Sequence, residues 1–134
     1  MVRHPVSRII SEYHYLRDGL MFIPESQSFS DWLQSIPEIY SKTRWSLDNH
    51  LRPICEMVPS NSVVFKLEDG LENVVSFLDD LANDQGGPRS IERAHQRLGT
   101  AEPAVPTAED IALIEKFYSR DFDRFEYDAK GSWV

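Results

Sequence analysis

The chain has 134 residues and a formal net charge of −8, and 41% of its residues are hydrophobic. This length allows one domain at most, and the apolar and aromatic content is typical of a folded chain rather than a disordered one. The acidic balance argues against nucleic acid as the main partner.

A single cysteine, Cys55, excludes an intrachain disulfide, and no metal is expected because histidine and cysteine never occur at zinc-like spacing. The sequence has no run of about 18 apolar residues and no signal-peptide pattern. The chain as given is therefore expected to be cytoplasmic. An anchor placed before Met1 in a longer parent would still be compatible with the sequence.

The first predicted helix covers residues 5–19, with Pro5 in its first turn and Gly19 as its stop. Arg3 lies just outside the N-terminus, where first-turn amides and the helix dipole favour an anion. A guanidinium there adds charge-assisted bonds to phosphate oxygens. Ser11, about two turns on, reaches the same anion only if the ligand lies along the helix flank. Taken alone, this pattern favours an ordinary amphipathic helix with a solvated arginine.

Three other side chains of this helix are expected to have lesser roles. Arg8 lies on another part of the helix surface and is a weaker phosphate candidate than Arg3. Glu12 is expected on a solvated face, since it would be catalytic only if it faced a pocket. His14 is expected at the surface.

Ser28 or Ser30 caps a second predicted helix over residues 28–36, which Pro37 interrupts before a resumption over residues 38–43. Residues 45–59 are predicted to be irregular, with the sequence Asn-His-Leu-Arg-Pro at their centre.

Residues 62–67 form the only good strand candidate, and the chain is expected to offer this strand no neighbour. A lone strand indicates an incomplete fold or a sheet supplied by a partner. Asp69 is predicted to cap a third helix, which ends near Ala82 and carries an apolar face.

Residues 83–106 are predicted to be a long loop, with a short helical turn over residues 91–98 and a basic series at Arg89, Arg93 and Arg97. The last predicted helix starts at Thr107, with Asp110 as a capping-box-like partner.

Four segments, in this order, resemble the sulfotransferase family that includes carbohydrate sulfotransferases and their bacterial relatives. The segments are residues 2–5 with Arg8 and Ser11, residues 49–53, residues 64–69 and residues 117–127. The first is similar to the family's 3′-phosphate motif, and the second to its His-aromatic-Arg-Pro element. The third is similar to its strand before a helix, and the fourth to its tyrosine and aspartate-phenylalanine pattern. Order and spacing, rather than any one segment, carry the resemblance.

The resemblance implies that the parent reaction transfers sulfate from 3′-phosphoadenosine 5′-phosphosulfate to a hydroxyl, most naturally on a carbohydrate. Arg3 and Ser11 would bind the 3′-phosphate of this cofactor, and His50 and Arg52 would bind substrate. His50 would act as a base or hydrogen-bond donor, or would only pin a loop, and no catalytic residue is assigned. The implied fold is mainly α with one or two short strands, the C-terminal part of an α/β P-loop-like sulfotransferase fold. Residues 1–127 would form this partial domain, and residues 128–134 a flexible tail.

The sequence also departs from the family pattern. His4 stands where the family usually has aspartate or asparagine, and Leu51 stands where it has an aromatic residue. No glycine-rich loop with a lysine occurs, although such a loop binds the 5′-phosphosulfate in this family. The chain alone is therefore expected to be inactive, and a separate N-terminal half is a candidate partner. The rival interpretation is a non-catalytic, acidic, helical protein-interaction module.

Overall fold

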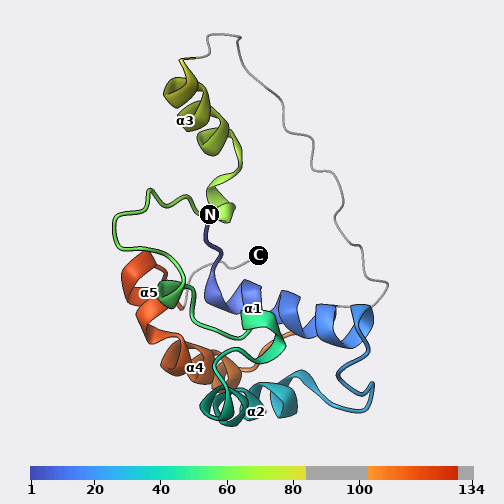
Figure 1. The fold of residues 1–134 in the computed structure, drawn as a ribbon. Helices are drawn as coiled ribbons and strands as arrows, with labels where there is room; N and C mark the ends of the chain where they lie inside the picture. Colours follow the sequence, from blue (N-terminus) through green and yellow to red (C-terminus); the bar gives the residue numbers. More distant parts are fainter. Residues whose placement is uncertain (84–102, 130–134) are drawn as a thin grey trace.

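The computed structural model describes residues 1–83 and 103–129 of the chain (Figure 1). The longer helices are α1 (Pro5–His14), α2 (Phe29–Lys42), α3 (Glu72–Ala82), α4 (Ala108–Phe117) and α5 (Ser119–Phe125). The short turns are the π-helical η1 (Tyr15–Gly19) and the 3-10 turns η2 (Ser46–Asn49), η3 (Ile54–Glu56) and η4 (Leu67–Asp69). The prediction of a mainly helical chain is confirmed.

A histidine caps helix α1 at the position where the sequence departs from the family pattern. Nδ1 of His4 accepts a hydrogen bond from the Val6 amide at 3.2 Å, as an aspartate or asparagine oxygen would. Because Nδ1 accepts, Nε2 carries the proton, and it donates to the Asp128 carbonyl at 3.1 Å. The ring is 3% exposed. His4 therefore fixes the helix start and ties it to the C-terminal segment.

Replacing His4 with alanine is expected to lower the free energy of unfolding by about 1–2 kcal/mol, because an N-cap and a buried hydrogen bond are lost. His4→Asn should cost less, since the shorter side chain still caps α1 but does not reach Asp128. Urea unfolding followed by circular dichroism measures both variants. An unchanged midpoint for His4→Ala would contradict the capping role.

Helix α2 is one continuous helix, so the predicted interruption at Pro37 is wrong. Ser28 does cap it, because its hydroxyl accepts from the Asp31 amide at 3.1 Å. Proline at position 37 removes one backbone donor. Burial of the apolar face outweighs that loss. The buried residues on this face are Phe29, Trp32, Leu33 and Ile36.

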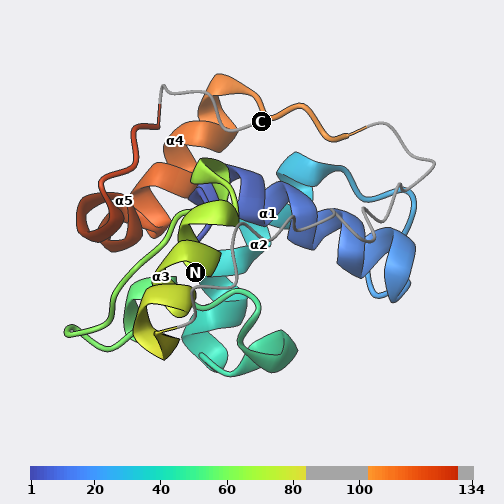
Figure 2. The ribbon, with the colours of Figure 1, turned by 90° about the horizontal axis from the view of Figure 1, so that it is seen from above.

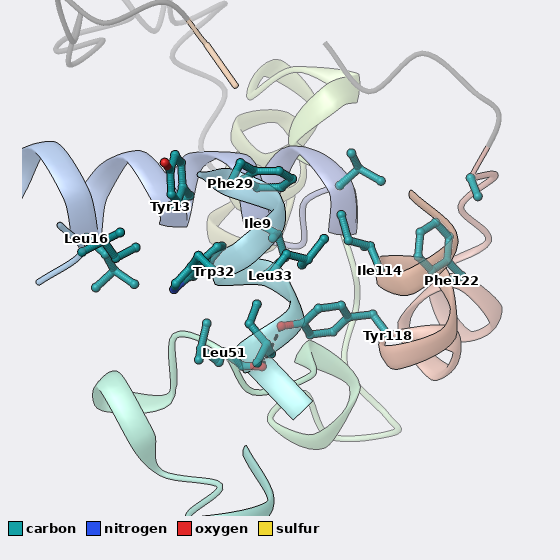
Figure 3. Close-up of a cluster of buried hydrophobic side chains, with 14 residues drawn as sticks. Ile9, Tyr13, Leu16, Phe29, Trp32, Leu33, Leu51, Ile114, Tyr118 and Phe122 are labelled. Atoms are coloured by element: carbon teal, nitrogen blue, oxygen red, sulfur yellow. Dashed lines mark hydrogen bonds between the residues drawn. The ribbon is translucent and has the colours of Figure 1, made fainter. Parts of the chain in front are cut away.

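The core lies where α1, α2 and α4 meet, and α5 and the loop after η2 close one end of it (Figure 3). The largest fully buried side chains include Tyr13 from α1, Leu33 from α2, Leu51 from the loop, and Ile114 with Tyr118 from the α4–α5 region. The Tyr118 hydroxyl donates to the Leu51 carbonyl at 2.9 Å, so the core also fixes the loop backbone.

The strand predicted over residues 62–67 does not form, because only Lys66 pairs with another residue. The expectation that the chain offers it no neighbour is also wrong. Val2 and Lys66 form a parallel bridge. The Val2 amide donates to the Phe65 carbonyl, and the Leu67 amide donates to the Val2 carbonyl, both at 2.8 Å. This single bridge is the only strand pairing among the described residues. It brings the start of α1 beside residues 65–67.

Helix α3 forms as predicted but differs in its cap and its packing. Leu71 is the N-cap and makes no side-chain hydrogen bond, so the prediction that Asp69 caps this helix is wrong. None of its residues is buried, and Leu81 is 74% exposed. Figure 1 shows α3 apart from the body formed by α1, α2, α4 and α5, and in Figure 2, seen from above, α3 lies in front of that body. Phe65 contacts Phe77 of this helix, with ring centroids 5.3 Å apart, but Leu78 and Leu81 on its apolar face stay exposed among the described residues.

The capping box of α4 is confirmed. The Asp110 amide donates to the Thr107 hydroxyl at 3.1 Å, and the Thr107 amide donates to the Asp110 carboxylate at 2.9 Å. Ser30 also donates to that carboxylate at 2.8 Å, which ties α4 to α2. The predicted turn over residues 91–98 and the basic series at Arg89, Arg93 and Arg97 lie outside the described residues. No helix in the described part of the chain has the length and apolarity needed to cross a bilayer.

Candidate functional site

Arg3 lies between bridged Val2 and the α1 cap His4, and it is half-buried. Its guanidinium makes no hydrogen bond or ion pair with any described residue. Ser11 is exposed on α1, about 12 Å further along the helix axis, and its hydroxyl likewise has no partner among the described residues. Both predicted phosphate ligands therefore keep their hydrogen-bonding groups free, and Arg3 lies beside a helix N-terminus.

Arg8 is not the weaker phosphate candidate that the sequence suggests, because its side chain supports a loop. Its Nη2 donates to the backbone carbonyls of His50 at 2.6 Å and Arg52 at 2.7 Å. Its Nη1 lies 3.9 Å from the Asp121 carboxylate, and its side chain is 15% exposed. Arg8 thus holds the loop that carries the predicted substrate residues and is not available to a ligand.

Asp121 holds the same loop from α5. It is fully buried, and its carboxylate accepts from the Ile54 amide at 2.8 Å and the Cys55 amide at 2.7 Å. Arg124, one turn further along, donates to the carbonyls of Cys55, Val58 and Pro59 at 2.6–2.7 Å. Residues 117–127 therefore hold the part of the loop that directly follows residues 49–53. Local sequence patterns do not predict these contacts, because the partners are far apart in the chain.

The loop before His50 has an unusual backbone. Leu47, Asp48 and Asn49 have φ values of 51°, 52° and 67°, three consecutive residues other than glycine in the left-handed region. Such conformations cost free energy and cluster at functional sites. The Asn49 side-chain oxygen is also buried without a hydrogen-bond partner in the described structure. These features set residues 47–50 apart from the rest of the fold.

His50 is bound by Glu12, which the sequence had placed on a solvated face. The Nδ1 atom of His50 lies 2.9 Å from both carboxylate oxygens of Glu12. The Glu12 side chain is 11% exposed and that of His50 is 39% exposed. Tyr15 stacks on the imidazole, with ring centroids 5.7 Å apart. Because a carboxylate only accepts, Nδ1 carries the proton, and Nε2 makes no hydrogen bond to a described residue.

The Glu12–His50 pair pins the loop, which is one of the two uses that the sequence left open. The hydrogen bond fixes the loop against α1, 38 residues away in the chain. It also sets the tautomer of the neutral imidazole, in which Nε2 keeps a free lone pair. No sequence pattern predicts this pairing, because helical periodicity carries no information about contacts with a loop so distant in the chain.

His14 is not a free surface residue, contrary to expectation. Its Nδ1 lies 3.0 Å from the Asp18 carboxylate, and its Nε2 accepts from the Ala104 amide at 2.9 Å. It links the end of α1 to the segment before α4 and plays no part in the site.

Arg52 belongs to a charge cluster centred on Glu56. The carboxylate of Glu56 receives Arg44 Nη2 at 2.7 Å, Arg52 Nε at 3.2 Å and the Tyr40 hydroxyl at 3.0 Å. Arg120 Nη1 lies 3.6 Å away. Burial acts to raise the pKa of Glu56, but the hydrogen bonds from Arg44, Arg52 and Tyr40 outweigh it, so the pKa falls below its ordinary value. Sequence reasoning missed this cluster, although the Arg52–Glu56 spacing of four was visible.

Glu56→Gln is expected to lower the free energy of unfolding at pH 7 by about 1–3 kcal/mol, since hydrogen bonds to a charged group are lost. The folded-state pKa is depressed, so the stabilisation is full above the ordinary glutamate pKa and is lost as the pH falls through the folded value. The difference between wild type and variant should therefore shrink below pH ~4.5. Urea unfolding at pH 7 and at low pH measures it. A difference that stays constant with pH would contradict the ionic role.

An open cavity of about 630 Å³ lies beside this cluster, at the C-terminal end of α2. It is lined by Tyr40, Ser41, Lys42, Thr43, Arg44, Trp45 and Glu56. Trp45 is 59% exposed, and the Arg52 and Arg44 guanidinium carbons lie 4.6 Å and 5.5 Å from its ring centroid. Sequence reasoning did not single out Trp45 or Arg44. The exposed tryptophan next to an arginine was the available signal.

Comparison with known proteins gives one positive result. A family model described as "Sulfotransferase family" matches residues 1–128, which include every residue placed at the site above. No curated protein and no solved structure matches the chain. The described residues include no group of three histidine, cysteine, aspartate or glutamate side chains that could hold a metal ion.

Proposed function

The chain belongs to the sulfotransferase family, and from that premise we propose that Arg3 and Ser11 bind the 3′-phosphate of 3′-phosphoadenosine 5′-phosphosulfate. The observation that carries the proposal is the unpaired, half-buried guanidinium of Arg3 directly before α1. A helix N-terminus favours an anion through its dipole, and a free guanidinium adds up to two charge-assisted bonds. Arg8 takes no part, because its Nη2 donates to two loop carbonyls and its buried Nη1 faces Asp121 inside the protein without a hydrogen bond.

The acceptor side of the same site would use His50 and Arg52, and the acceptor would be a carbohydrate hydroxyl. When bound, the nucleotide supplies the sulfuryl group that the acceptor oxygen receives. His50 Nε2 would take the hydroxyl proton while Glu12 holds Nδ1 and stabilises the imidazolium. Support comes from the orientation of the ring and from the strained backbone of residues 47–49.

The 134 residues alone would not transfer sulfate, because no glycine-rich loop with a lysine is present to bind the 5′-phosphosulfate. A second segment carrying such a loop and more of the sheet would complete an α/β fold. Three observations support this part of the proposal. The parallel bridge at Val2 is a single pair, Val63 is 62% exposed, and Leu81 on the apolar face of α3 is 74% exposed.

Titration calorimetry with adenosine 3′,5′-bisphosphate tests the nucleotide site. We expect Arg3→Ala to weaken binding about 10- to 100-fold, since a charged bond to phosphate is worth roughly 1.5–3 kcal/mol. Ser11→Ala should weaken it less, because a neutral hydroxyl contributes less. Lys116→Ala is the matched control. Lys116 is exposed on α4 and has no partner among the described residues.

Equal losses for Arg3→Ala and Lys116→Ala would mean that only overall charge matters, and the site assignment would fall. A folded, monodisperse wild-type chain with no affinity for this nucleotide would support the rival, a non-catalytic interaction module.

A further inference from the structure

Helix α3 carries an apolar stripe that the described residues leave largely open. Leu78 and Leu81 are each more than half exposed, and Phe65 contacts only the neighbouring Phe77. Exposed apolar side chains gathered on one helix face are typical of an interaction surface. In Figure 1, α3 lies on one side of α1 and α2 lies on the other, so the stripe is far from the body of the molecule that surrounds α2.

All the charged residues of α3 are acidic. They are Glu72, Asp79 and Asp80, and the helix contains no lysine, arginine or histidine. Asp80 lies one turn from Phe77 and Asp79 one turn from Val75, so acidic positions border the apolar stripe on both edges. A second α3 packed against this stripe would bring like charges together, which is unfavourable. The stripe therefore suits a partner surface that is both apolar and basic.

The cavity at the C-terminal end of α2 offers such a surface on the same chain. Trp45 in its wall is more than half exposed. Three arginines surround the carboxylate of Glu56 and leave an excess of two positive charges; they are Arg44, Arg52 and Arg120. Arg44 is about half exposed and Arg120 mostly exposed, so this charge faces solvent. Tryptophan and arginine are the residues most often found at binding hot spots.

We propose that α3 of one copy docks on the Trp45 cavity of a second copy, with Leu78 and Leu81 against the indole and the α3 carboxylates beside the arginines. The cavity of about 630 Å³ is open, so it can receive side chains from the surface of a helix. Because α3 and α2 lie on opposite sides of α1, a chain does not close this contact on itself. Each copy carries both surfaces, so two copies related by a two-fold axis make the contact twice.

This pairing is independent of the nucleotide site. A second sheet segment of the kind proposed above would compete with the second copy for Leu81. The pair is therefore the form that the chain takes without such a segment.

Sedimentation equilibrium of the full chain at increasing concentration tests the pairing. We expect the average mass to rise from that of one chain to that of two. Trp45→Ala and Leu81→Gln should each weaken the association about tenfold or more, because each removes a large apolar side chain from the contact. Met21→Gln is the matched control, since Met21 is 84% exposed in the loop after η1 and belongs to neither surface. It should leave the association within about twofold.

A charge reversal tests the ionic part of the contact. Arg120→Glu should weaken the association about fivefold or more, because it places a carboxylate opposite the acidic edges of α3. Lys116→Glu makes the same change in net charge on α4, away from both surfaces, and should have an effect within about twofold. Equal losses for these two variants would mean that overall charge alone governs association, and the proposed contact would fall.

Mixing two variants distinguishes this contact from other dimers. The Trp45→Ala chain keeps its α3 stripe and the Leu81→Gln chain keeps its cavity, so a mixed pair can still form one of the two contacts. We expect the equimolar mixture to associate more strongly than either variant alone. In a pair joined by α3 against α3, Trp45→Ala would have no effect, and that result excludes the proposed contact.

A chain that stays monomeric at every concentration would overturn the inference, because α3 would then be covered within its own chain or have no affinity for a second copy. A mixture that associates no more strongly than the two variants alone has the same consequence. Both substituted side chains are more than half exposed, so the variants should fold. Circular dichroism of each variant checks that a loss of association is not a loss of fold.

Discussion

Replacing Asp121 with alanine is expected to lower the free energy of unfolding by about 3–5 kcal/mol, a large part of the stability of a domain of this size. The carboxylate is fully buried and accepts from the amides of Ile54 and Cys55. Alanine leaves both amides without an acceptor in a dry environment. It also removes the acidic partner of Arg8. Urea unfolding followed by circular dichroism measures the loss.

Asp123→Ala is the matched control, because Asp123 lies exposed on the same helix. It should change stability by less than about 0.5 kcal/mol. Asp121→Asn should fall between the two, since one oxygen still accepts while the amide group faces a second donor. An Asp121→Ala protein within 1 kcal/mol of wild type would show that water or a shifted loop replaces the carboxylate.

Cys55 gives a second readout of the same loop. Burial, then the hydrogen bond and charge of Asp121, raise the pKa of this thiol to about 11, so it reacts slowly at neutral pH. In Asp121→Ala we expect faster labelling by Ellman's reagent, because the loop opens and the charge is gone. Unchanged labelling alongside lost stability would place the damage elsewhere in the fold.

Local signals in the sequence predicted local structure well. The first helix with its stop at Gly19, the Ser28 cap and the Thr107–Asp110 box all depend on residues a few positions apart. Pro37 misled because the buried face of α2 outweighs one missing hydrogen bond. The packing of α3 could not be predicted from the sequence. An apolar stripe indicates that a helix has a face to bury, but it does not indicate whether the described chain covers that face.

The candidate site could be predicted only in part from the sequence, because sequence patterns report on residues that are close together in the chain. The resemblance marked Arg3, His50 and Arg52, and the structure gives each a distinct environment. The contacts that define those environments join distant residues, such as Glu12 with His50 and Asp121 with Ile54. Periodicity and capping rules carry no information about such pairs. The family-like motifs therefore located the segments of the site, but they did not distinguish side chains that support the loop from side chains proposed to bind a ligand.

Arg8→Met is expected to lower the free energy of unfolding by about 2–4 kcal/mol, while Arg3→Met is expected to change it by less than about 0.5 kcal/mol. Arg8 donates to two loop carbonyls and lies beside buried Asp121, so methionine leaves these groups unpaired. Arg3 has no partner in the described structure to lose. Urea unfolding without nucleotide measures both variants. Arg8→Lys is a milder third variant that keeps the charge.

Affinity for adenosine 3′,5′-bisphosphate should show the reverse order. Arg3→Met removes a proposed phosphate ligand and leaves the fold intact, whereas Arg8→Lys weakens the fold and leaves the phosphate contacts in place. A double-mutant cycle between Arg8→Lys and Asp121→Asn should give a coupling of about 0.5–3 kcal/mol, because the two side chains share one network. Zero coupling would contradict the shared network of Arg8 and Asp121. Nucleotide affinity that depends on Arg8 more than on Arg3 would reverse the roles of the two arginines. Arg8 would then be the phosphate ligand, and the phosphate would have to lie over the loop rather than at the start of α1.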